Sequence, residues 1–538
     1  MIKHNMMKNI IYGLCFVLLA SCELGDFGEN LQENPNLLTP DQADPNFILN
    51  NVQKETADLL QDLNRTTDEV MRYTVLNETY GDVASDNSLN GEYTNYYAFL
   101  QDATIIENLA ANDDDLLFHR GMYNILASYA TVTMVDYLGD IPFSEAIRTD
   151  ELVLNPAVDD DQSIYNAVLD RLDNAIVDIQ NATVLPLNDL FYGTISNIED
   201  RKRAWIRLSK SLQFKMLVNI GDIDKINLLL AEDDFINPSE DFQFQYGTNQ
   251  VDPNSRHPDF NAGYTPGGFD QFLGNSFLNL LLNDKTISDP RIRYYVYRQN
   301  GANPSDTLLG CVGEANFDFC FLGNAYYGRD HGDTRSRGAD AIFRATYGLY
   351  PVGGAFDEDN PSAPNFAIDT QNQSGAGILP ILLSSFVDFL RAEAAISLGT
   401  NDDAAVLLES GIRKSMNKVL NFSGGIATSS PFASNQSNVD DYVTEVMSEF
   451  AAADDNRKLD IILTEYYLAS YGNSTESYNG YRRTGFPSVF SAPVFDANSP
   501  FPRLFSYPSD AVINNTQINQ RPIINQVFWD TNPAGFIN

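Results

Sequence analysis

Histidine and tryptophan are scarce in this chain, and the sequence signatures of several common enzyme classes are missing. The 538 residues include 4 His and 2 Trp. So few histidines disfavour a His-based acid–base or metal site. The sequence contains no P-loop, no Gly-rich dinucleotide fingerprint after a strand, no HExxH and no G-x-S-x-G elbow. We therefore expect no enzyme, no resident metal and no cofactor.

Basic residues are also few. The chain has 34 Lys and Arg against 73 Asp and Glu, which gives a formal net charge of −39. Such a chain would repel nucleic acid and anionic lipid headgroups. An uncharged ligand, such as a neutral glycan, fits this charge better. Excess acid also keeps proteins soluble in salty surroundings, so charge alone does not identify the ligand.

Long hydrophobic runs are missing except near the N-terminus. The run there covers residues 10–20 and is too short to cross a bilayer, which takes about 20 apolar residues. It follows Lys3 and Lys8 and leads into Leu-Ala-Ser-Cys, which ends at Cys22. This order is that of a lipoprotein signal, so we expect residues 1–21 to be removed and Cys22 to carry lipid. An ordinary signal peptide with a chance cysteine is the alternative.

Cysteine is sparse as well. Of the 4 Cys, Cys15 lies in the signal segment and Cys22 is the expected lipidation site. Cys311 and Cys320 remain, and exported proteins can keep disulfides. We expect these two to form a disulfide, with two free thiols as the alternative. Metal binding is disfavoured because the segment between them has no His and its spacing matches no zinc pattern.

Helical periodicity dominates the rest of the sequence. Residues 22–45 are rich in Asn, Pro and Asp and predict an extended tether. Beyond it, apolar residues recur with a period near 3.6. This pattern predicts helices at about 46–63, 116–137, 161–179, 201–220, 222–231, 380–399, 402–420, 439–450 and 455–471.

The helices occur in pairs whose length and small residues at the crossings are typical of tetratricopeptide units. The pairs are interrupted by loop-rich blocks at 233–270 and 300–378, and the chain from 473 onward also looks irregular. Blocks of this length are usually functional or contain small strands of their own. We therefore predict one mainly α-helical domain, residues 46–538, with long irregular insertions.

One loop partly matches a calcium-binding pattern. Asp86, Ser88 and Asn90 have the spacing of the first ligands of an EF-hand, and Gly91 follows. The twelfth position is Tyr97, where the pattern requires Glu. An Asn/Gly turn without metal is the better interpretation.

Aromatic clusters are the strongest indication of a ligand site. Sugars offer CH faces that stack on aromatic rings, and hydroxyls that bond to Asp, Asn, Arg and Gln, and a concave site with a few polar groups suits them. The alternative is that these rings hold irregular loops onto the helices. The candidate ligand contacts lie in three clusters: Tyr93, Tyr96 and Tyr97; Phe260, Tyr264 and Phe269; and Tyr326 and Tyr327.

Taken together, the chain resembles the SusD/RagB family of bacterial outer-membrane nutrient-binding lipoproteins, in its SusD-like branch. The resemblance follows the expected lipoprotein signal and extends over nearly the full length. Its segments are DYLGDIPFSEA (136–146), RAWIRLSKSLQFKML (203–217), TYGLYPVGGAFD (346–357), SSFVDFLRAEAAISLG (384–399), YNGYRRTGFP (478–487), PRLFSYPSDAVINN (502–515) and VFWD (527–530).

The resemblance implies a helical, tetratricopeptide-like protein that is anchored by lipid to the outer membrane and exposed at the cell surface. It implies capture of oligosaccharides without catalysis, and delivery to a SusC-like TonB-dependent transporter. Arg482, Arg483 and Arg503 would then support the scaffold and would not contact ligand. The ligand site varies among members, so the aromatic candidates are not assigned by the resemblance.

Two other functions stay open. Some members of the family bind peptides. A hydrolase on a helical scaffold would need two carboxylates about 5–10 Å apart in its cleft. In a chain with 73 acidic residues such pairs arise by chance, so the sequence does not decide this point.

Overall fold

The structure is a computed structural model that describes residues 44–76, 79–147, 153–264, 271–333, 343–360, 373–494 and 499–537. The expected signal peptide, the lipidation site Cys22, almost all of the tether and the candidate Phe269 lie outside these ranges. Within them, no helix is both long and apolar enough to cross a membrane.

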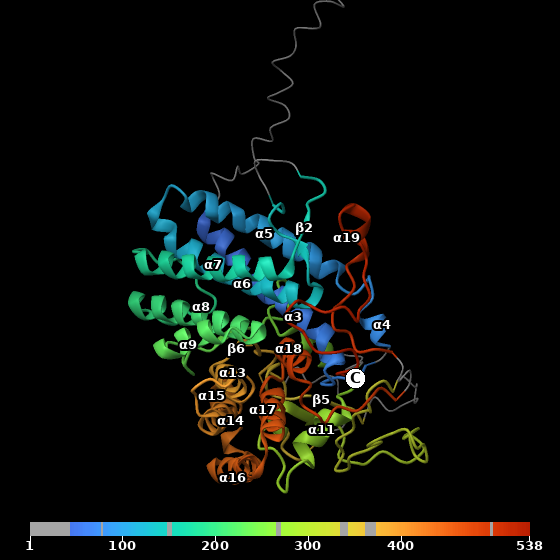
Figure 1. Ribbon diagram of the computed structural model, residues 1–538. Helices are drawn as coiled ribbons and strands as arrows, with labels where there is room; N and C mark the ends of the chain where they lie inside the picture. Colours follow the sequence, from blue (N-terminus) through green and yellow to red (C-terminus); the bar gives the residue numbers. More distant parts are fainter. Residues whose placement is uncertain are drawn as a thin grey trace, which may run out of the picture.

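Helices make up most of the regular structure (Figure 1). The N-terminal part contains α3 (Pro45–Val70), α4 (Tyr80–Val83), α5 (Asn90–Ala110), η3 (Asp114–Leu116), α6 (Leu117–Leu138), β1 (Ile141–Pro142), β2 (Val158–Asp159), α7 (Asp161–Asn181), α8 (Ile198–Ile220), α9 (Ile223–Glu232) and β3 (Phe242–Gln245). The middle contains α10 (Pro258–Gly263), α11 (Asn275–Leu282), α12 (Ile292–Tyr295), β4 (Val296–Arg298), β5 (Ala345–Tyr347) and β6 (Ile378–Leu382). The C-terminal part contains α13 (Ser384–Ser397), α14 (Ala404–Leu420), α15 (Phe422–Gly425), η6 (Ile426–Ser429), α16 (Gln436–Ala452), α17 (Asp455–Ala469), α18 (Ser474–Thr484) and α19 (Ser509–Asn514).

Local sequence signals fix several helix ends. Asp44 caps α3 by accepting from the backbone N–H of Asn46, and Pro45 occupies the first helical position. Asn197 caps α8 in the same way, and Gly221 ends α8 in the left-handed conformation. These short-range signals explain why the boundary between α8 and α9 was predictable.

Helix α6 is the centre of the N-terminal part. Beyond its first turn it is buried on every side, and Leu126 and Ala130 are fully buried. Helices α3, α5, α7 and α8 pack around it. In the C-terminal part α13 packs against α14 and α17, and its contact with α8 joins the two parts.

The predicted mainly α-helical fold of paired helices is therefore confirmed. The helices expected at 116–137, 161–179, 201–220, 222–231, 402–420, 439–450 and 455–471 correspond to α6, α7, α8, α9, α14, α16 and α17. The helix expected at 380–399 begins four residues late, because residues 378–382 form β6.

Several helices of the described residues were not predicted, and α5 and α18 are the longest of them. Residues 90–110 form α5, so the aromatic cluster at 93–97 lies on a helix and not beside a turn. The turn predicted at 86–91 covers only 86–89. Helix α18 occupies the start of the C-terminal block that was expected to be irregular.

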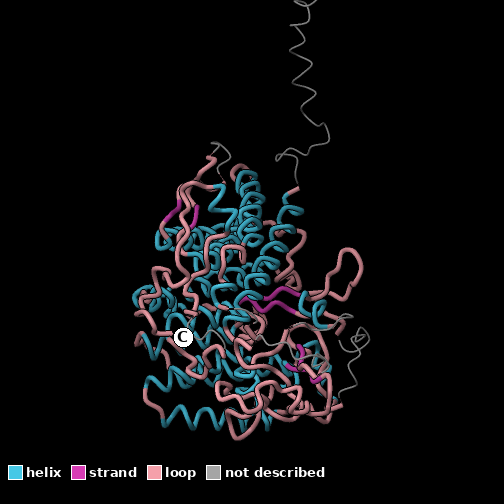
Figure 2. The backbone as a smooth tube through the Cα atoms, turned by 90° about the vertical axis from the view of Figure 1, so that its right-hand side faces the viewer, coloured by secondary structure: helices cyan, strands magenta, loops and turns pink. Residues whose placement is uncertain are grey.

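Three two-stranded antiparallel sheets are formed by the described residues. Strand β3 pairs with β6, with a register shift between Phe242 and Gln243. Because this pair joins residues on either side of the long middle region, it brings both ends of that region to the helical scaffold. Figure 2 shows the side of the molecule where loops and turns cover much of the surface.

Buried arginines connect the C-terminal segment to the helices. Arg482 is fully buried and donates to the carbonyl oxygens of Asp136 at 2.8 Å and Arg503 at 2.6 Å. Arg483 binds both carboxylate oxygens of Glu393, at 2.5 Å and 2.7 Å. Arg503 pairs with buried Asp530. These contacts join the C-terminal segment to α6 and α13, in agreement with a scaffold role for the three arginines.

Candidate functional site

The aromatic candidates are dispersed in the structure, and only some of them border open space. Phe260 of α10 and Tyr264, which directly follows this helix, stack on each other with ring centroids 4.6 Å apart, and both are buried. The Tyr264 hydroxyl donates to the carbonyl of Tyr347. We withdraw this pair as ligand contacts, because neither ring presents a free face.

Tyr326 and Tyr327 also lie apart from the first cluster. Tyr327 is fully buried in a small second core with Val75, Phe272 and Leu309. Tyr327 is therefore also withdrawn as a ligand contact. Tyr326 borders a polar hollow, but it is only 4% exposed, and the guanidinium of Arg298 covers one face of its ring, with Cζ 4.8 Å from the ring centroid.

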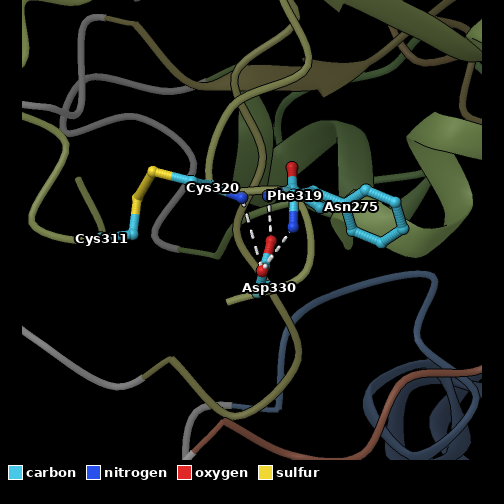
Figure 3. The surroundings of a disulfide bond; sticks show 5 residues. All are labelled: Asn275, Cys311, Phe319, Cys320 and Asp330. Atoms are coloured by element: carbon cyan, nitrogen blue, oxygen red, sulfur yellow. Dashed lines mark hydrogen bonds between the residues drawn. A yellow bond between two sulfur atoms is a disulfide. The ribbon is translucent and has the colours of Figure 1, made fainter. Parts of the chain in front are cut away.

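A disulfide stabilises the loop beside this second core. Cys311 and Cys320 are bonded to each other. Asp330 anchors the end of the loop, because its carboxylate accepts from the backbone N–H of Phe319 at 3.0 Å and from the side chain of Asn275 at 2.5 Å (Figure 3). The loop is thus a structural element of the middle region.

Tyr93 and Tyr97 remain, and they form one wall of a cavity of about 460 Å³. We call it the tyrosine pocket. It lies between α5, the β1–β2 hairpin and α19. Its apolar walls are Tyr93, Tyr97, Pro142, Ala146, Ile147, Val153, Leu154, Pro156 and Ala511, and its polar groups come from Thr94, Glu145, Asp510, Asn514 and Asn515.

The two rings of the pocket are one helical turn apart and are held by their neighbours. They meet edge to face with centroids 4.8 Å apart. The Tyr97 hydroxyl donates to the carbonyl of Pro142 at 2.8 Å, which fixes α5 against β1. Tyr96 points inward and bonds to Thr131 at 3.0 Å, so it is a core residue and is also withdrawn. Burial raises the pKa of Tyr93 and Tyr97, so both hydroxyls stay protonated.

Hydrogen bonds also position the rim of the pocket. Glu145 accepts from the backbone N–H of Ala157 at 2.8 Å. Asn515 donates its side-chain amide to the carbonyl of Pro156 at 2.9 Å. These bonds connect residues 145–157 with Asn515, and the bond from Tyr97 to Pro142 adds α5. Sequence reasoning found the tyrosines from their clustering but missed the residues of 142–156 and 510–515, because no local signal places them beside α5.

One rim residue is in a strained conformation. Ile147 has a φ of 54°, a left-handed value that is unusual for a β-branched residue. Such conformations cost about 1–3 kcal/mol and concentrate at functional sites, where surrounding contacts maintain them. Other described residues away from the pocket, such as Arg72 and Asp233, also have positive φ, so this strain does not by itself identify the functional site.

An acidic cluster close to the hairpin is better explained by structure. Oxygen atoms of Asp140, Asp160 and Asp161 lie within 4.8 Å of one another. Asp160 caps α7 by accepting from the backbone N–H of Ser163 at 3.0 Å, and Asp161 accepts from that of Phe528 at 2.8 Å. Burial raises the pKa of Asp161 to about 6. These bonds start α7 and hold the C-terminal segment, so we assign the cluster no metal.

Two family models match the sequence. Residues 35–319 match a model described as starch-binding and associating with the outer membrane. Residues 361–525 match a model described as SusD and RagB outer membrane lipoprotein. Among curated proteins, none matches the chain.

Solved structures share the fold. A SusD homologue from Bacteroides fragilis is 17% identical, with a TM-score of 0.66 and coverage of 91% of this chain and 99% of that one. A chitin-binding protein is 18% identical, with a TM-score of 0.66 and coverage of 91% and 100%. A chitin-binding SusD homologue from Flavobacterium johnsoniae is 17% identical, with a TM-score of 0.61 and coverage of 90% and 98%.

Proposed function

Because the chain belongs to the SusD/RagB family, we propose that it captures neutral oligosaccharides at the cell surface and passes them to a SusC-like TonB-dependent transporter. The tyrosine pocket is the proposed binding site. The role is binding without catalysis, and it requires no cofactor.

The observation that carries this proposal is the pair of tyrosine rings on the wall of an open pocket. Ligand pockets in proteins typically have volumes of about 300–1,000 Å³, apolar walls and a few well-placed polar groups. The tyrosine pocket has these properties, since rings and aliphatic side chains form its walls and carboxylates and amides form its rim. Sugar rings offer the matching surfaces, with CH faces toward the rings and hydroxyls toward the rim.

The solved relatives suggest which glycan to test first. Two of the similar structures are of chitin-binding proteins. Chitin is a neutral polymer, which suits a chain of net charge −39. Chito-oligosaccharides are therefore the first ligands to test, beside other neutral glycans.

We further propose that the protein is held at the outer membrane by lipid on Cys22 after removal of residues 1–21. The length from Cys22 to the start of α3 at Pro45 would then be the tether. More than one acyl chain is needed for stable anchoring, because a single chain binds membranes only reversibly. Mass spectrometry of the membrane-extracted protein tests this, with a triacylated N-terminal cysteine as the expected product and an unmodified N-terminus as the contrary one.

A peptide ligand is the second candidate. The aliphatic residues Pro142, Ile147, Leu154 and Pro156 give the pocket enough apolar wall for a peptide side chain. A peptide mixture therefore belongs in the same binding experiment.

Isothermal titration of the chain from residue 23 onward tests the proposal. The ligands are chitohexaose, cellohexaose, laminarihexaose and a peptide mixture, and released products are followed in the same samples. We expect one neutral hexasaccharide to bind without cleavage. Tyr93→Ala should weaken this binding about tenfold, and Tyr93→Phe should weaken it less, because it keeps the ring. Binding of peptides alone, or release of shorter sugars, would replace the proposal with the peptide or hydrolase alternative.

A further inference from the structure

Another candidate surface, with mainly polar side chains, lies at the other end of the molecule from the tyrosine pocket. Helices α5 and α19 and strand β2 lie at the top of Figure 1, and α16 lies at the bottom. Two hollows occur near α16. The amide hollow has a volume of about 370 Å³ and is lined by residues of α14, α16 and the segment between them. The arginine hollow has a volume of about 600 Å³ and is lined by residues of 282–303 together with Asn324, Tyr326 and Asp359.

Phe432 lines neither hollow, but it lies two residues before Ser434 of one and contacts Arg293 of the other, and we call this segment the Phe432 ridge. Ser434 lines the amide hollow and donates its hydroxyl to the carbonyl of Pro290 at 2.9 Å. Arg293 lines the arginine hollow, and its guanidinium carbon lies 4.9 Å from the centroid of the Phe432 ring. Phe432 itself is 40% exposed. The Arg293 guanidinium therefore covers one face of the Phe432 ring, and the rest of this ring is open to solvent.

The polar groups in these hollows are mostly neutral or already balanced. Arg298 binds Asp357 with two nitrogen atoms, at 2.7 Å and 2.8 Å. Arg293 lies 3.3 Å from Asp357 and 3.5 Å from Asp359. An anionic ligand would have to compete with these carboxylates, whereas a neutral polar ligand would not.

The arginine and amide side chains that line the amide hollow are also held by neighbouring side chains. Arg413 pairs with Glu409 at 2.8 Å and with Asp440 at 2.6 Å. Asn421 donates its side-chain amide to the side-chain oxygen of Asn417 at 2.9 Å. Side chains held in this way lose little freedom when a ligand binds, which favours affinity.

We propose that the Phe432 ridge and its two hollows form a second binding site for neutral oligosaccharides, with one sugar ring stacked on Phe432 and its neighbours hydrogen-bonded in the hollows. This inference rests on the proposed function, because it assigns the same class of ligand to a separate surface. The ridge offers one aromatic face between two polar depressions, so it suits a chain of several sugars better than a single one.

Titration of the purified protein with chitohexaose, cellohexaose and laminarihexaose tests the inference. The wild-type protein should bind the preferred hexasaccharide at two sites. Phe432→Ala should remove one of them or weaken it at least about fivefold, and Phe432→Trp should retain it. Phe47→Ala is the matched control, because Phe47 is also an exposed phenylalanine, at 73%, but lies on α3 outside both hollows. It should bind like the wild type.

The variants separate the two proposals. If one site is found that is lost in Tyr93→Ala and unchanged in Phe432→Ala, the second site is wrong and the proposed function stands. If Phe432→Ala loses binding and Tyr93→Ala does not, the ridge is a glycan site and the assignment of the tyrosine pocket is wrong. If no hexasaccharide binds to the wild-type protein, both proposals fail. Equal losses in Phe432→Ala and Phe47→Ala would also contradict a site at the ridge.

Discussion

Around α18, Lys215 and Glu476 form an ion pair whose side chains are 3% and 2% exposed, whereas in the tyrosine pocket the ring of Tyr93 lines open space. The interior pair is completed by Tyr129 and Tyr466, whose hydroxyls donate to Glu476 at 3.3 Å and 2.9 Å. In this interior cluster, the polar groups bond to one another and support the fold. In the pocket, the wall stays available to a ligand. Stability and binding should therefore depend on different residues.

The largest expected effect comes from breaking the interior ion pair. Lys215→Met would leave Glu476 as a buried charge without its cation, which costs about 3–5 kcal/mol. Urea unfolding measures this loss. Lys54→Met is the control, because Lys54 pairs with Asp58 at the surface and should change the unfolding free energy by less than about 1 kcal/mol. Equal effects of the two variants would contradict the assignment, and adding Glu476→Gln to Lys215→Met should recover part of the loss.

The next effect is a pH dependence from Asp68, which lines a small cavity together with His257 and Asp259. Burial raises the pKa of Asp68 to about 7. An unfolded aspartate titrates near pH 3.9, so the folded protein keeps a proton that the unfolded chain releases. The contribution of Asp68 to the free energy of unfolding should therefore fall as the pH rises from about 4 to about 7, by roughly 3 kcal/mol. His257 lines the same cavity and contributes in the opposite direction, because burial lowers its pKa to about 4. The contribution of Asp68 is therefore measured as the difference between the wild type and a variant without this carboxyl.

Replacing Asp68 by Asn tests this pH dependence. The variant keeps a side chain of the same size that does not ionise, so it should be more stable than the wild type at pH 8 and similar to it at pH 4. Unfolding by urea at several pH values measures both proteins. A variant with the same slope as the wild type would show that other groups cause it.

Removing the disulfide should have a smaller effect on stability and none on the tyrosine pocket. Cys311 and Cys320 are separated by 9 positions, and a loop of about this length contributes about 2–3 kcal/mol through restriction of the unfolded chain. Replacing both by Ser should lower the melting temperature by a few degrees and leave affinity for the hexasaccharide unchanged. Loss of affinity at unchanged melting temperature would show that this loop contributes to binding. It would then contradict the separation between residues that stabilise the fold and residues that bind the ligand.

The smallest expected effect concerns the strained rim. Ile147→Gly removes the strain of a branched residue in the left-handed conformation, but it also removes one apolar wall of the pocket. These two effects oppose each other in the folded protein, so the unfolding free energy should change by less than about 1 kcal/mol. Affinity for the hexasaccharide should fall about threefold to tenfold, because the wall is lost. Unchanged affinity would show that Ile147 does not contribute to binding.

The helical scaffold was largely predictable because its signals are local. Helices such as α7 and α14 have one apolar stripe, and Asp160 and Asp403 cap them within the first turn. Helix α5 was missed because it begins with Asn-Gly, a typical turn sequence. The tyrosines that follow were therefore interpreted as an aromatic cluster beside a turn. Helix α18 was missed because its buried residues are largely polar, such as Glu476 and Arg482, and their partners are far away in sequence.

The site was predictable only in part. Tyr93 and Tyr97 were found because aromatic residues cluster at 93–97, although this cluster was expected beside a turn. They line one pocket because they are four residues apart on α5 and so lie on one face of that helix. The rest of the pocket depends on tertiary contacts, such as the bond from Asn515 to Pro156, that join residues hundreds of positions apart. The same kind of packing buries Phe260 and Tyr264, whose glycine-rich surroundings had suggested an exposed loop.

A crystal structure of the protein with chitohexaose tests the central claim most directly. The account predicts sugar rings in the tyrosine pocket, with one ring against Tyr93 and hydroxyl or amide groups bonded to the rim residues Asp510 and Asn515. Cellohexaose and laminarihexaose serve in the same experiment if chitohexaose does not bind. An empty tyrosine pocket in a crystal that holds the bound glycan elsewhere on the chain would contradict the account.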